Sequence, residues 1–398
     1  MIEALKRPEV QQFIKDHLYD DPADLMLRSS RFPELPMREV AEQIRARLKA
    51  KSKLPEWFET EGLLYPGRVS VEQSSSEALA RYKAKWVQGQ TMADLTGGMG
   101  VDCYYLSQHF KTAHYVERQE ALVALAEHNY KVLEATQVSC HHQDSLDFLK
   151  SSDQQFDLIY IDPARRAAGN RKVAGFEDCE PNMISLMPLL RARAEKVMIK
   201  ASPMLDIKKA ISDLGGVAEV HVIADRNEVK ELLFIDSGAP LEAPPVHCVN
   251  LSPQGEATFH FDFEQESRAE VSYSTVQEYL YEPNAALLKA GAFRSVTSAF
   301  GLKKLHPNTH LYTADHWLEA FPGRTFKVMA DVALQKKALK KQLPGMKAHI
   351  AVRNYPMSVE AIRKKTGLKE GGTHYVFGFT DQNGTNAVIC ERMTADGS

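Results

Sequence analysis

Cysteine is scarce in this chain of 398 residues, and the cysteines that are present lie far apart. There are five of them, with no Cys-X-X-Cys pair: Cys103, Cys140, Cys179, Cys248 and Cys390. Scattered single cysteines argue against a disulfide framework and against a zinc site built on cysteine. We therefore expect no bound metal and a reducing compartment, the cytoplasm.

Long apolar runs are also lacking. No stretch approaches the roughly 18 consecutive apolar residues that a membrane-spanning helix needs, so we expect no membrane partner. Residues 1–16 are polar and carry acids, unlike a signal or transit peptide. The apolar fraction of 44% is sufficient for ordinary globular cores. At roughly 100–200 residues per domain, the length predicts two to four domains.

A strong net charge is absent as well, but the small value of −3 hides an uneven distribution. Residues 281–398 contain 17 Lys or Arg and 9 Asp or Glu, whereas the rest of the chain contains 32 and 43. A basic C-terminal part indicates an anionic partner such as a nucleic acid. Lysine-rich helix faces that serve only solubility are the alternative.

Two regions with different patterning precede residue 241. Residues 1–85 have apolar positions at helical spacing and few strand signals, which predicts a helical N-terminal domain. Residues 86–240 alternate short apolar strands with helices, which predicts an α/β fold with a mostly parallel sheet covered on both faces. The expected strands cover residues 91–95, 113–117, 138–141, 156–161 and 196–200, followed by an antiparallel pair at 218–224 and 231–235.

The C-terminal part begins after a proline-rich boundary at residues 240–245. A hairpin is expected over residues 246–263, and a helix over residues 279–300. Residues 321–398 combine four short strands with helices at 334–342 and 358–366, which predicts an α+β module with an antiparallel sheet. We thus expect two C-terminal domains, at residues 241–320 and 321–398.

A glycine-rich turn follows the first expected strand and opens a helix. It reads Asp94-Leu95-Thr96-Gly97-Gly98-Met99-Gly100. Glycines let the backbone turn sharply and approach a ligand closely, and ligands of such sheets bind beyond the carboxyl ends of the strands. A dinucleotide-binding fingerprint would need Gly or Ala at position 103, where this chain has Cys103.

Acidic residues stand at or just after the ends of the first four strands: Asp94, Glu117, Asp144 and Asp162. A carboxylate accepts hydrogen bonds, so Glu117 can accept them from ribose hydroxyls and Asp144 from an adenine amino group. Acids in this order suit adenosine and a cationic sulfonium, whereas they would repel a pyrophosphate. Each acid taken alone is equally consistent with a helix cap or a solvated turn.

These motifs resemble a class I S-adenosylmethionine-dependent methyltransferase. The turn matches the glycine motif of that superfamily, with Thr96 in place of its first glycine, as in some nucleic-acid methyltransferases. The resemblance implies a Rossmann-like sheet over residues 86–240 and S-adenosylmethionine as cofactor. The cofactor-binding residues that it implies are Asp94, Thr96, Gly98, Gly100, Glu117, Arg118, Asp144 and Ser145. Upstream, residues 72–84 resemble the segment that packs over the cofactor in related RNA enzymes.

The run from Ile161 to Arg166 resembles the Asp-Pro-Pro-Arg motif of several tRNA and rRNA methyltransferases. This resemblance implies that Asp162 and the Pro163 carbonyl accept hydrogen bonds from a target amine. It implies that Arg165 stacks on a base or binds a phosphate, and Arg166 is expected to contact the substrate. A turn in which Asp162 caps a helix is the alternative.

Two further residues near this run deserve a chemical interpretation. Cys179 could act as a nucleophile, but the motif that surrounds a catalytic cysteine in RNA uracil methyltransferases is missing. Lys200 follows the fifth strand and either lines the pocket or lies on the surface.

The C-terminal half resembles two domains of a bacterial methyltransferase family. Residues 281–293 and 301–307 resemble its ferredoxin-like insert, and residues 321–392 resemble its THUMP-like domain. THUMP domains bind RNA in tRNA-modifying enzymes, so the resemblance implies an RNA partner. The side chains expected to bind RNA here are Lys303, Lys304 and Arg353.

The sequence therefore predicts a methyltransferase that modifies a nucleotide of tRNA or rRNA, in which catalysis is mostly positioning because the methyl donor is already activated. A methyltransferase for a small molecule or a protein is one alternative, although it leaves the basic module without a purpose. A catalytically silent RNA-binding adaptor is another, and the intact acids at the strand ends argue against it.

Overall fold

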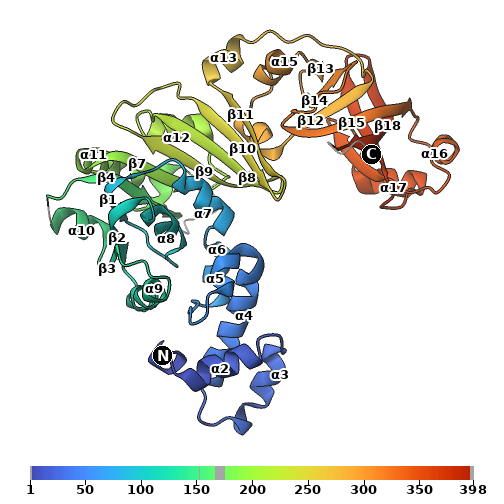
Figure 1. Cartoon of the computed structure of the whole chain (residues 1–398). Coiled ribbons are helices and arrows are strands. Elements are labelled where there is room, and N and C mark those ends of the chain that lie inside the picture. The colour runs from blue at the N-terminus through green and yellow to red at the C-terminus, as the bar shows by residue number, and fades with distance from the viewer. Residues whose placement is uncertain (1, 152, 166–174, 395–398) are drawn as a thin grey trace. The chain divides into compact units, whose positions relative to one another are not determined.

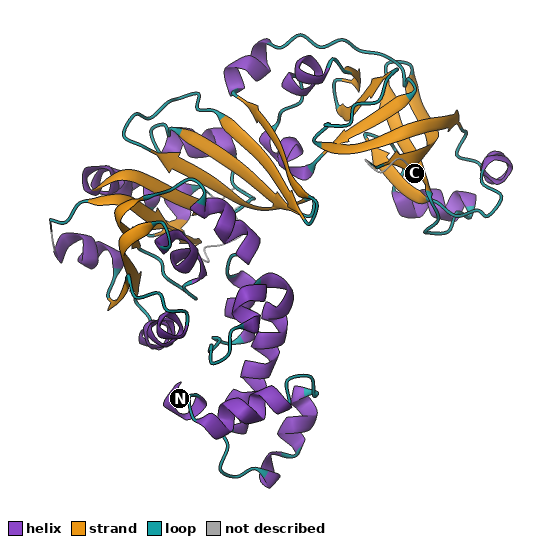
Figure 2. Ribbon diagram, viewed as in Figure 1, coloured by secondary structure: helices purple, strands orange, loops and turns teal. Residues whose placement is uncertain are grey.

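The computed structural model describes residues 2–151, 153–165 and 175–394 (Figures 1 and 2). The chain forms two compact units: residues 1–218 with 233–242 make unit 1, and residues 219–232 with 243–398 make unit 2. Within the described ranges, no helix is both long enough and apolar enough to span a bilayer.

The N-terminal part of unit 1 is helical, as predicted, and is drawn in blue in Figure 1. Its longest helix, α4, buries Met37, Val40, Ala41 and Ile44, which recur at helical spacing. Prolines stand in the first turns of α2, α3 and α5, where the missing N–H costs nothing. The helices are α1 (Ile2–Leu5), α2 (Pro8–Asp16), α3 (Pro22–Leu27), η1 (Ser29–Arg31), α4 (Met37–Lys53), α5 (Pro55–Glu59), α6 (Arg68–Gln73) and α7 (Glu77–Ala84).

Buried amide side chains hold the segment after α5 in place. The Gln43 side chain donates to the Tyr65 carbonyl at 2.6 Å and accepts from the Tyr65 N–H at 2.9 Å. Asn129 makes the same pair of bonds with the backbone of Leu64, at 2.8 and 2.9 Å. Because buried backbone groups need partners, these two side chains fasten the helical part to the α/β part of unit 1.

Five strands of unit 1 form a parallel sheet in the order β7-β4-β1-β2-β3, with β9 beyond β7. The predicted parallel sheet is therefore confirmed. The strands are β1 (Gly89–Asp94), β2 (Phe110–Glu117), β3 (Val138–His142), β4 (Phe156–Ile161) and β7 (Ala194–Ala201). The helices are α8 (Val101–Ser107), α9 (Glu120–Val132), α10 (Ser145–Ser151), η2 (Phe176–Asp178), α11 (Met183–Arg193) and α12 (Ile207–Asp213), and a small pair consists of β5 (Ala164–Arg165) and β6 (Cys179–Glu180).

The strand order reverses beside β1. The chain runs from β1 to β2 and β3 on one side and then returns to place β4 on the other. Crossovers that leave in opposite directions open a crevice at the carboxyl ends of the two central strands, and open α/β sheets bind their ligands there. The fold therefore points to the ends of β1 and β4 as the place for a site.

Unit 2 begins with strands in the order β11-β10-β8-β9, in which β9 contributes residues 228–232 and passes into unit 1. Strands β10 and β11 form the predicted hairpin, and β10 runs parallel to β8. The elements are β8 (Glu219–Asp225), β9 (Glu228–Asp236), β10 (Val246–Ser252), β11 (Gly255–Phe261) and α13 (Phe263–Arg268).

The second sheet of unit 2 has seven strands in the order β13-β14-β12-β15-β18-β17-β16. It joins strands from both sides of residue 320, so the expected boundary there does not separate two sheets. The elements are β12 (Tyr279–Pro283), α14 (Ala285–Ala290), α15 (Ser295–Phe300), β13 (Lys303–His306), β14 (Thr309–Ala314), β15 (Gly323–Asp331), α16 (Lys336–Gln342), β16 (His349–Arg353), α17 (Val359–Thr366), β17 (His374–Asp381) and β18 (Gly384–Met393).

Two expectations about this sheet were wrong. Residues 279–283 form the inner strand β12 instead of the start of a helix, because β12 pairs with both β14 and β15 and such pairing overrides a local helical pattern. The sheet is also not purely antiparallel, since β16 and β17 are parallel. The helix α17 connects them, and a helical crossover is the connection that parallel strands require.

Candidate active site

The glycine turn after β1 is shaped by close contacts. A Cβ atom at Gly97 would lie 2.2 Å from the Tyr115 ring, and one at Gly100 would lie 2.5 Å from the Tyr130 hydroxyl oxygen. Gly100 also has a φ of 85°, which strains any other residue. The Asp94 carboxylate accepts a hydrogen bond from the Thr96 N–H at 3.0 Å and closes the turn from within. Only glycine fits these two positions.

A cavity of about 700 Å³ lies at the carboxyl ends of these strands. This volume is typical of a small-molecule site. All eight residues predicted to bind the cofactor line it: Asp94, Thr96, Gly98, Gly100, Glu117, Arg118, Asp144 and Ser145. Ser74 and Ser75, from the segment after α6, lie on its wall as well. The structure thus brings the predicted residues together, and their part in binding stays a prediction.

Glu117 is held by backbone N–H groups on both of its oxygens. Its Oε2 accepts from the Gly98 N–H at 3.0 Å and its Oε1 from the Gln119 N–H at 2.9 Å. An ionised carboxylate has about four lone-pair sites, so capacity for further donors remains. The carboxylate is therefore oriented by the turn and still able to accept hydrogen bonds from a ligand.

The other acidic and polar wall residues also have partners within the chain. Asp144 is exposed and accepts from the Leu146 N–H at 2.8 Å, as in a cap of α10. The Ser145 hydroxyl donates to the Leu95 carbonyl at 2.6 Å. Arg118 is exposed and forms an ion pair with Glu180 at 2.8 Å, so its guanidinium stands at the rim with a carboxylate.

Asp162 stands at the end of β4 with a side chain that is 40% exposed. Its backbone N–H donates to the Thr96 hydroxyl at 2.7 Å, so the threonine that replaces a motif glycine joins the two strand ends. Its Oδ2 forms an ion pair with Lys200 Nζ at 2.6 Å. Lys200 is therefore part of the cavity wall and not a plain surface residue.

The remaining predicted catalytic residues lie beside the cavity or outside the described residues. Pro163 is buried, and Arg165 pairs through its backbone with Cys179 in the strands β5 and β6. Arg166 lies outside the described residues. The Cys179 thiol is buried and donates to the Gly175 carbonyl at 3.8 Å, and Cys179 is absent from the cavity lining.

A buried charge network, which the sequence alone did not reveal, adjoins Asp162. Asp102, in the first turn of α8, pairs with Lys83 at 3.0 Å and with Lys200 at 3.4 Å. It also accepts hydrogen bonds from the Ser75 and Tyr160 hydroxyls, both at 2.8 Å. Lys200 thus lies between two carboxylates, one buried and one facing the cavity.

Two buried carboxyl groups of this wall, those of Asp94 and Asp102, have opposite pKa shifts. Burial by itself would raise the pKa of Asp102, but the ammonium groups of Lys83 and Lys200 and the two hydroxyl donors hold it well below its usual range. For Asp94, burial is the largest effect and raises its pKa to about 8; the nearby acids add to the shift, and the Thr96 N–H and the Lys200 ammonium only partly offset it. The cavity wall thus combines a carboxyl group whose pKa is lowered with one whose pKa is raised to about 8.

Lys83 carries the sequence signal that would have revealed this network. It lies on α7 among the buried residues Ala80, Tyr82 and Ala84 and is itself fully buried. A lysine within the apolar face of a helix needs a buried anion as a partner, and that expectation would have led to Asp102.

A solved crystal structure resembles this chain along nearly its whole length. It is that of a Porphyromonas gingivalis protein named as a candidate methyltransferase, with 33% sequence identity, a TM-score of 0.88 and coverage of 98% of either chain. The chain belongs to the same methyltransferase family. The predicted Rossmann-like sheet with a helical N-terminal part is the fold of this family.

The resemblance of the C-terminal part to ferredoxin-like and THUMP-like domains is confirmed, and the expected domain bounds stay a prediction. Residues 279–322 match a family of ferredoxin-like domains, and residues 323–392 match a family described as THUMP domain-like. Two Mycobacterium tuberculosis proteins, each named as an uncharacterized S-adenosylmethionine-dependent methyltransferase, are 24% identical over 305 residues, which is 75% of this chain and 80% of theirs.

The basic residues predicted to contact RNA in this methyltransferase differ in their surroundings. Lys303 is exposed on β13. Lys304 is 3% exposed and donates to the Pro307 carbonyl at 2.7 Å, while burial lowers its pKa. Arg353 forms an ion pair with the buried carboxylate of Glu282, to which Arg324 also binds. The structure therefore corrects the expectation for Lys304, whose ammonium is enclosed, and gives Arg353 a structural partner.

A lysine-rich surface lies elsewhere in the THUMP-like domain of this family member. Lys336, Lys337, Lys340 and Lys341 are exposed on α16, whereas Leu339 is fully buried. Lys364 and Lys365 are exposed on α17, which shares a hydrophobic core with α16. We call the six lysines of these two helices the lysine surface. These six lysines are part of the excess basic charge of residues 281–398.

Proposed function

We propose that this protein is an S-adenosylmethionine-dependent methyltransferase that modifies a nucleotide of tRNA or rRNA. One observation carries the proposal. The cavity at the strand reversal joins acceptors suited to adenosine, Glu117 and Asp144, with the reaction-site residue Asp162. A binding pocket and a candidate catalytic carboxylate therefore share one space.

The residues that line the cavity fit the cofactor. S-adenosylmethionine supplies, when bound, a methyl group already activated by the positive charge of its sulfonium. Glu117 would accept hydrogen bonds from the two ribose hydroxyls, because the Gly98 and Gln119 N–H groups hold its carboxylate at the wall. Asp144 would accept one from the adenine amino group. The acidic wall also favours a cation over a phosphate.

We assign to Asp162 the role of binding the target amine. Lys200 binds its Oδ2, which leaves Oδ1 on a side chain 40% exposed beside the cavity. A carboxylate in this position accepts hydrogen bonds from an amino group and receives the proton that the nitrogen loses after methylation. The Pro163 carbonyl would accept a hydrogen bond from the second amine hydrogen. Arg165 and Arg166 would contact the base and its phosphates.

The C-terminal charge supports RNA as the substrate. The lysine surface offers six ammonium groups on two adjoining helices, and Lys303 adds another on β13. Phosphate contacts of this kind grip a nucleic-acid backbone without reading its sequence. A small-molecule or protein methyltransferase would have no use for this surface, and a silent adaptor would have no use for the acid-lined cavity.

The test is methyl transfer to RNA from a strain that lacks the gene. Purified protein is incubated with S-adenosylmethionine labelled in its methyl group and with total RNA from the deletion strain or from its parent. Label should enter RNA from the deletion strain alone, because the parental RNA already carries the modification. Label in protein or small molecules would support the first alternative. Cofactor binding without transfer to any fraction would support the adaptor.

A further inference from the structure

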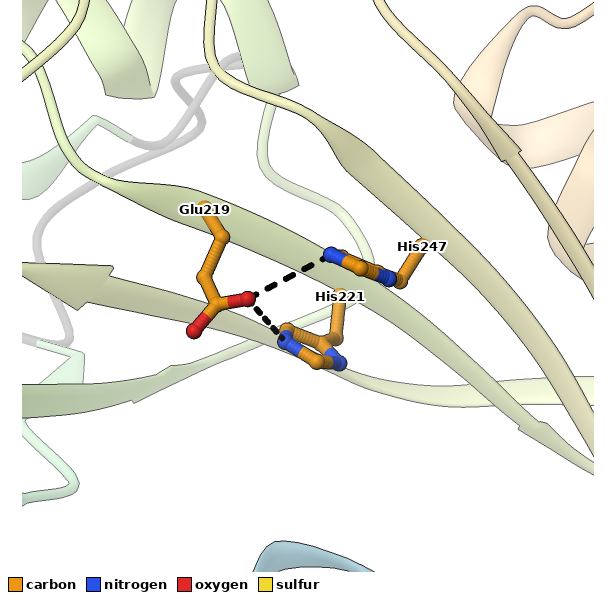
Figure 3. Close-up of side chains that lie close together, drawn as sticks. All are labelled: Glu219, His221 and His247. Carbon is orange, nitrogen blue, oxygen red and sulfur yellow. Dashed lines mark ion pairs between the residues drawn. The ribbon is translucent and has the colours of Figure 1, made fainter. Parts of the chain in front are cut away.

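Three side chains of unit 2 converge outside the cavity described above. Glu219 and His221 come from β8 and His247 from β10 (Figure 3). The Glu219 Oε2 atom lies 3.6 Å from His221 Nε2 and 3.3 Å from His247 Nε2. One ligand atom from each residue lies within 4.8 Å of the other two. Both imidazoles direct Nε2 toward the same carboxylate oxygen, as the dashed lines in Figure 3 show.

The strand register explains this convergence. Side chains two residues apart on a strand point to the same face, so Glu219 and His221 share one face of β8. His221 stands opposite His247 in the parallel pair of β8 and β10, and His247 stands opposite His260 in the hairpin. Three imidazoles therefore stand in a row across three adjacent strands. The His221 and His247 rings are stacked, with centroids 4.5 Å apart.

The electrostatics of the cluster favour a cation. An imidazole coordinates a metal ion through the lone pair of a ring nitrogen. The Glu219 carboxylate adds a negative charge to the ring nitrogens of His221 and His247. In the described part of the chain, the ion pairs of Glu219 are formed with these two histidines. A bound cation would balance the charge of the Glu219 carboxylate within this cluster.

We propose that Glu219, His221 and His247 bind a divalent first-row transition-metal ion, with Zn²⁺ as the best match. Imidazole nitrogen and carboxylate oxygen are regular zinc ligands, whereas Mg²⁺ and Ca²⁺ prefer oxygen alone. With bonds of about 2.0–2.1 Å, ligand atoms of a tetrahedral zinc ion lie about 3.3 Å apart. The two distances from Glu219, 3.3 and 3.6 Å, agree with this spacing, and the three candidate ligand atoms all lie within 4.8 Å of one another.

The exposure of the row provides an entry path and a further ligand. His221 is fully buried, the His247 side chain is 15% exposed, and His260 is exposed at the outer strand. The His260 ring meets the His247 ring edge to face, with centroids 4.7 Å apart. A metal held by three protein ligands keeps a fourth position for water or another ligand. His260 stands on the open side, where it would take that position or guide the ion inward.

The experiment measures zinc binding by the full chain and is independent of methyl transfer. Protein stripped with a chelator is desalted and titrated with ZnCl₂ in competition with a chromogenic chelator, and retained metal is counted by elemental analysis. We expect one Zn²⁺ per chain. Glu219→Gln and His247→Ala should each weaken binding by about 100-fold or more, since even residues that only support a ligand contribute roughly 10–100-fold. Mg²⁺ should not compete.

A matched control comes from another histidine–carboxylate pair in unit 2. His316 lies 2.9 Å from Asp315 on the surface, with no second histidine in the pair. His316→Ala should therefore bind zinc as tightly as the wild type, and melting curves check that every variant is folded. Glu219→Gln keeps the shape of the side chain and guards against a folding defect. Absence of stoichiometric zinc in the wild type, or equal affinity in folded Glu219→Gln and wild type, would overturn the proposal.

Discussion

Each unit buries a carboxylate against two cations, but the two clusters differ in their surroundings. In unit 1, Asp102 is neutralised by Lys83 and Lys200, and Lys200 also binds Asp162 at the cavity. In unit 2, Glu282 is neutralised by Arg324 and Arg353. The residues that line the cavity include Asp102, Asp162 and Lys200, whereas Glu282 is not among them.

The choice of cation matches this difference. The planar guanidinium of arginine holds a carboxylate in a fixed geometry. This suits Glu282, whose carboxylate two arginines bind in unit 2. The lysine ammonium has three donors on a flexible stem, so Lys200 can serve Asp102 and Asp162 together. Buried charge alone therefore does not mark a site. The candidate site is distinguished by a buried cation that also binds a carboxylate facing the cavity.

The largest effect is expected at Asp162. We expect Asp162→Ala to lower turnover on the true RNA substrate by roughly 100-fold or more, because a group that takes a proton in catalysis typically contributes 10²–10⁴-fold. Affinity for S-adenosylhomocysteine should change less than about threefold. Methyl incorporation and calorimetry measure the two quantities. The control is Asp147→Ala, an exposed acid of α10. Turnover within about threefold of wild type would make Asp162 a structural cap.

The next effect concerns cofactor affinity. Glu117→Ala should weaken S-adenosylhomocysteine binding by roughly 3 kcal/mol, or about 100-fold, through the loss of two charge-assisted hydrogen bonds. Circular dichroism should remain that of the wild type. The exposed acid Glu120, at the start of α9, offers the matched control. Unchanged calorimetric affinity would remove Glu117 from the site and leave it as a support for the Gly98 N–H.

Glu282 tests the structural side of the comparison. Glu282→Gln should lower the free energy of unfolding by about 2 kcal/mol and leave cofactor affinity unchanged. The expected loss is below the roughly 3–5 kcal/mol of a fully buried pair, since the two arginine side chains are 31% and 38% exposed. Urea unfolding followed by calorimetry measures both quantities. A loss of cofactor affinity in the folded variant would break the distinction between the two clusters.

RNA binding should depend on the lysine surface. Replacing Lys336 and Lys340 by Gln removes two charges on one face of α16, at i and i+4. The salt dependence of RNA binding should become shallower by about 0.7 per lost contact with a single strand, which corresponds to about tenfold weaker binding near 0.2 M salt. Gel-shift titrations at several salt concentrations measure the slope. A double variant of the exposed Lys111 and Lys150 in unit 1 serves as control; equal slopes in the two variants would place the phosphate contact elsewhere.

The smallest effect is a pH dependence of cofactor affinity. Burial raises the pKa of Asp94 to about 8, so this carboxyl is mostly protonated at pH 7 and half ionised at pH 8. The ionised form attracts the cationic cofactor, so affinity for S-adenosylmethionine should rise about fivefold between pH 7 and pH 8. Calorimetry at both pH values measures it. Asp94→Asn should abolish the rise, and a wild-type affinity that is flat over this range would contradict the assignment.

The predicted site residues illustrate why part of the site could be derived from the sequence. Glu117 ends β2 and Asp162 directly follows β4, and parallel strands bring their carboxyl ends to one edge. A pattern along the chain thereby becomes a cluster in space. The glycines of the turn could be predicted for a similar reason, since their backbone conformation is a local property.

The features that were predicted wrongly or missed depend instead on long-range contacts. Residues 279–283 carry a helical pattern but form β12, because they pair with strands on both sides, β14 and β15. Lys304 looked like a surface cation, yet its side chain turns inward over the Phe293 ring. Asp102 and Lys200 are 98 residues apart and meet only through the sheet. These outcomes depend on contacts with residues distant in the sequence, although Lys304 also donates to the nearby Pro307 carbonyl.

The sequence by itself determined the alternation of strands and helices, the glycine turn and the acids at the strand ends. Periodicity and turn chemistry depend on residues a few positions apart, and these preferences act before any long-range contact forms. Only the tertiary structure decided which carboxylates are neutralised, which lysines reach solvent, and that Glu219, His221 and His247 meet across β8 and β10. Strand register and burial bring together residues that are distant along the chain, and no local pattern records that pairing.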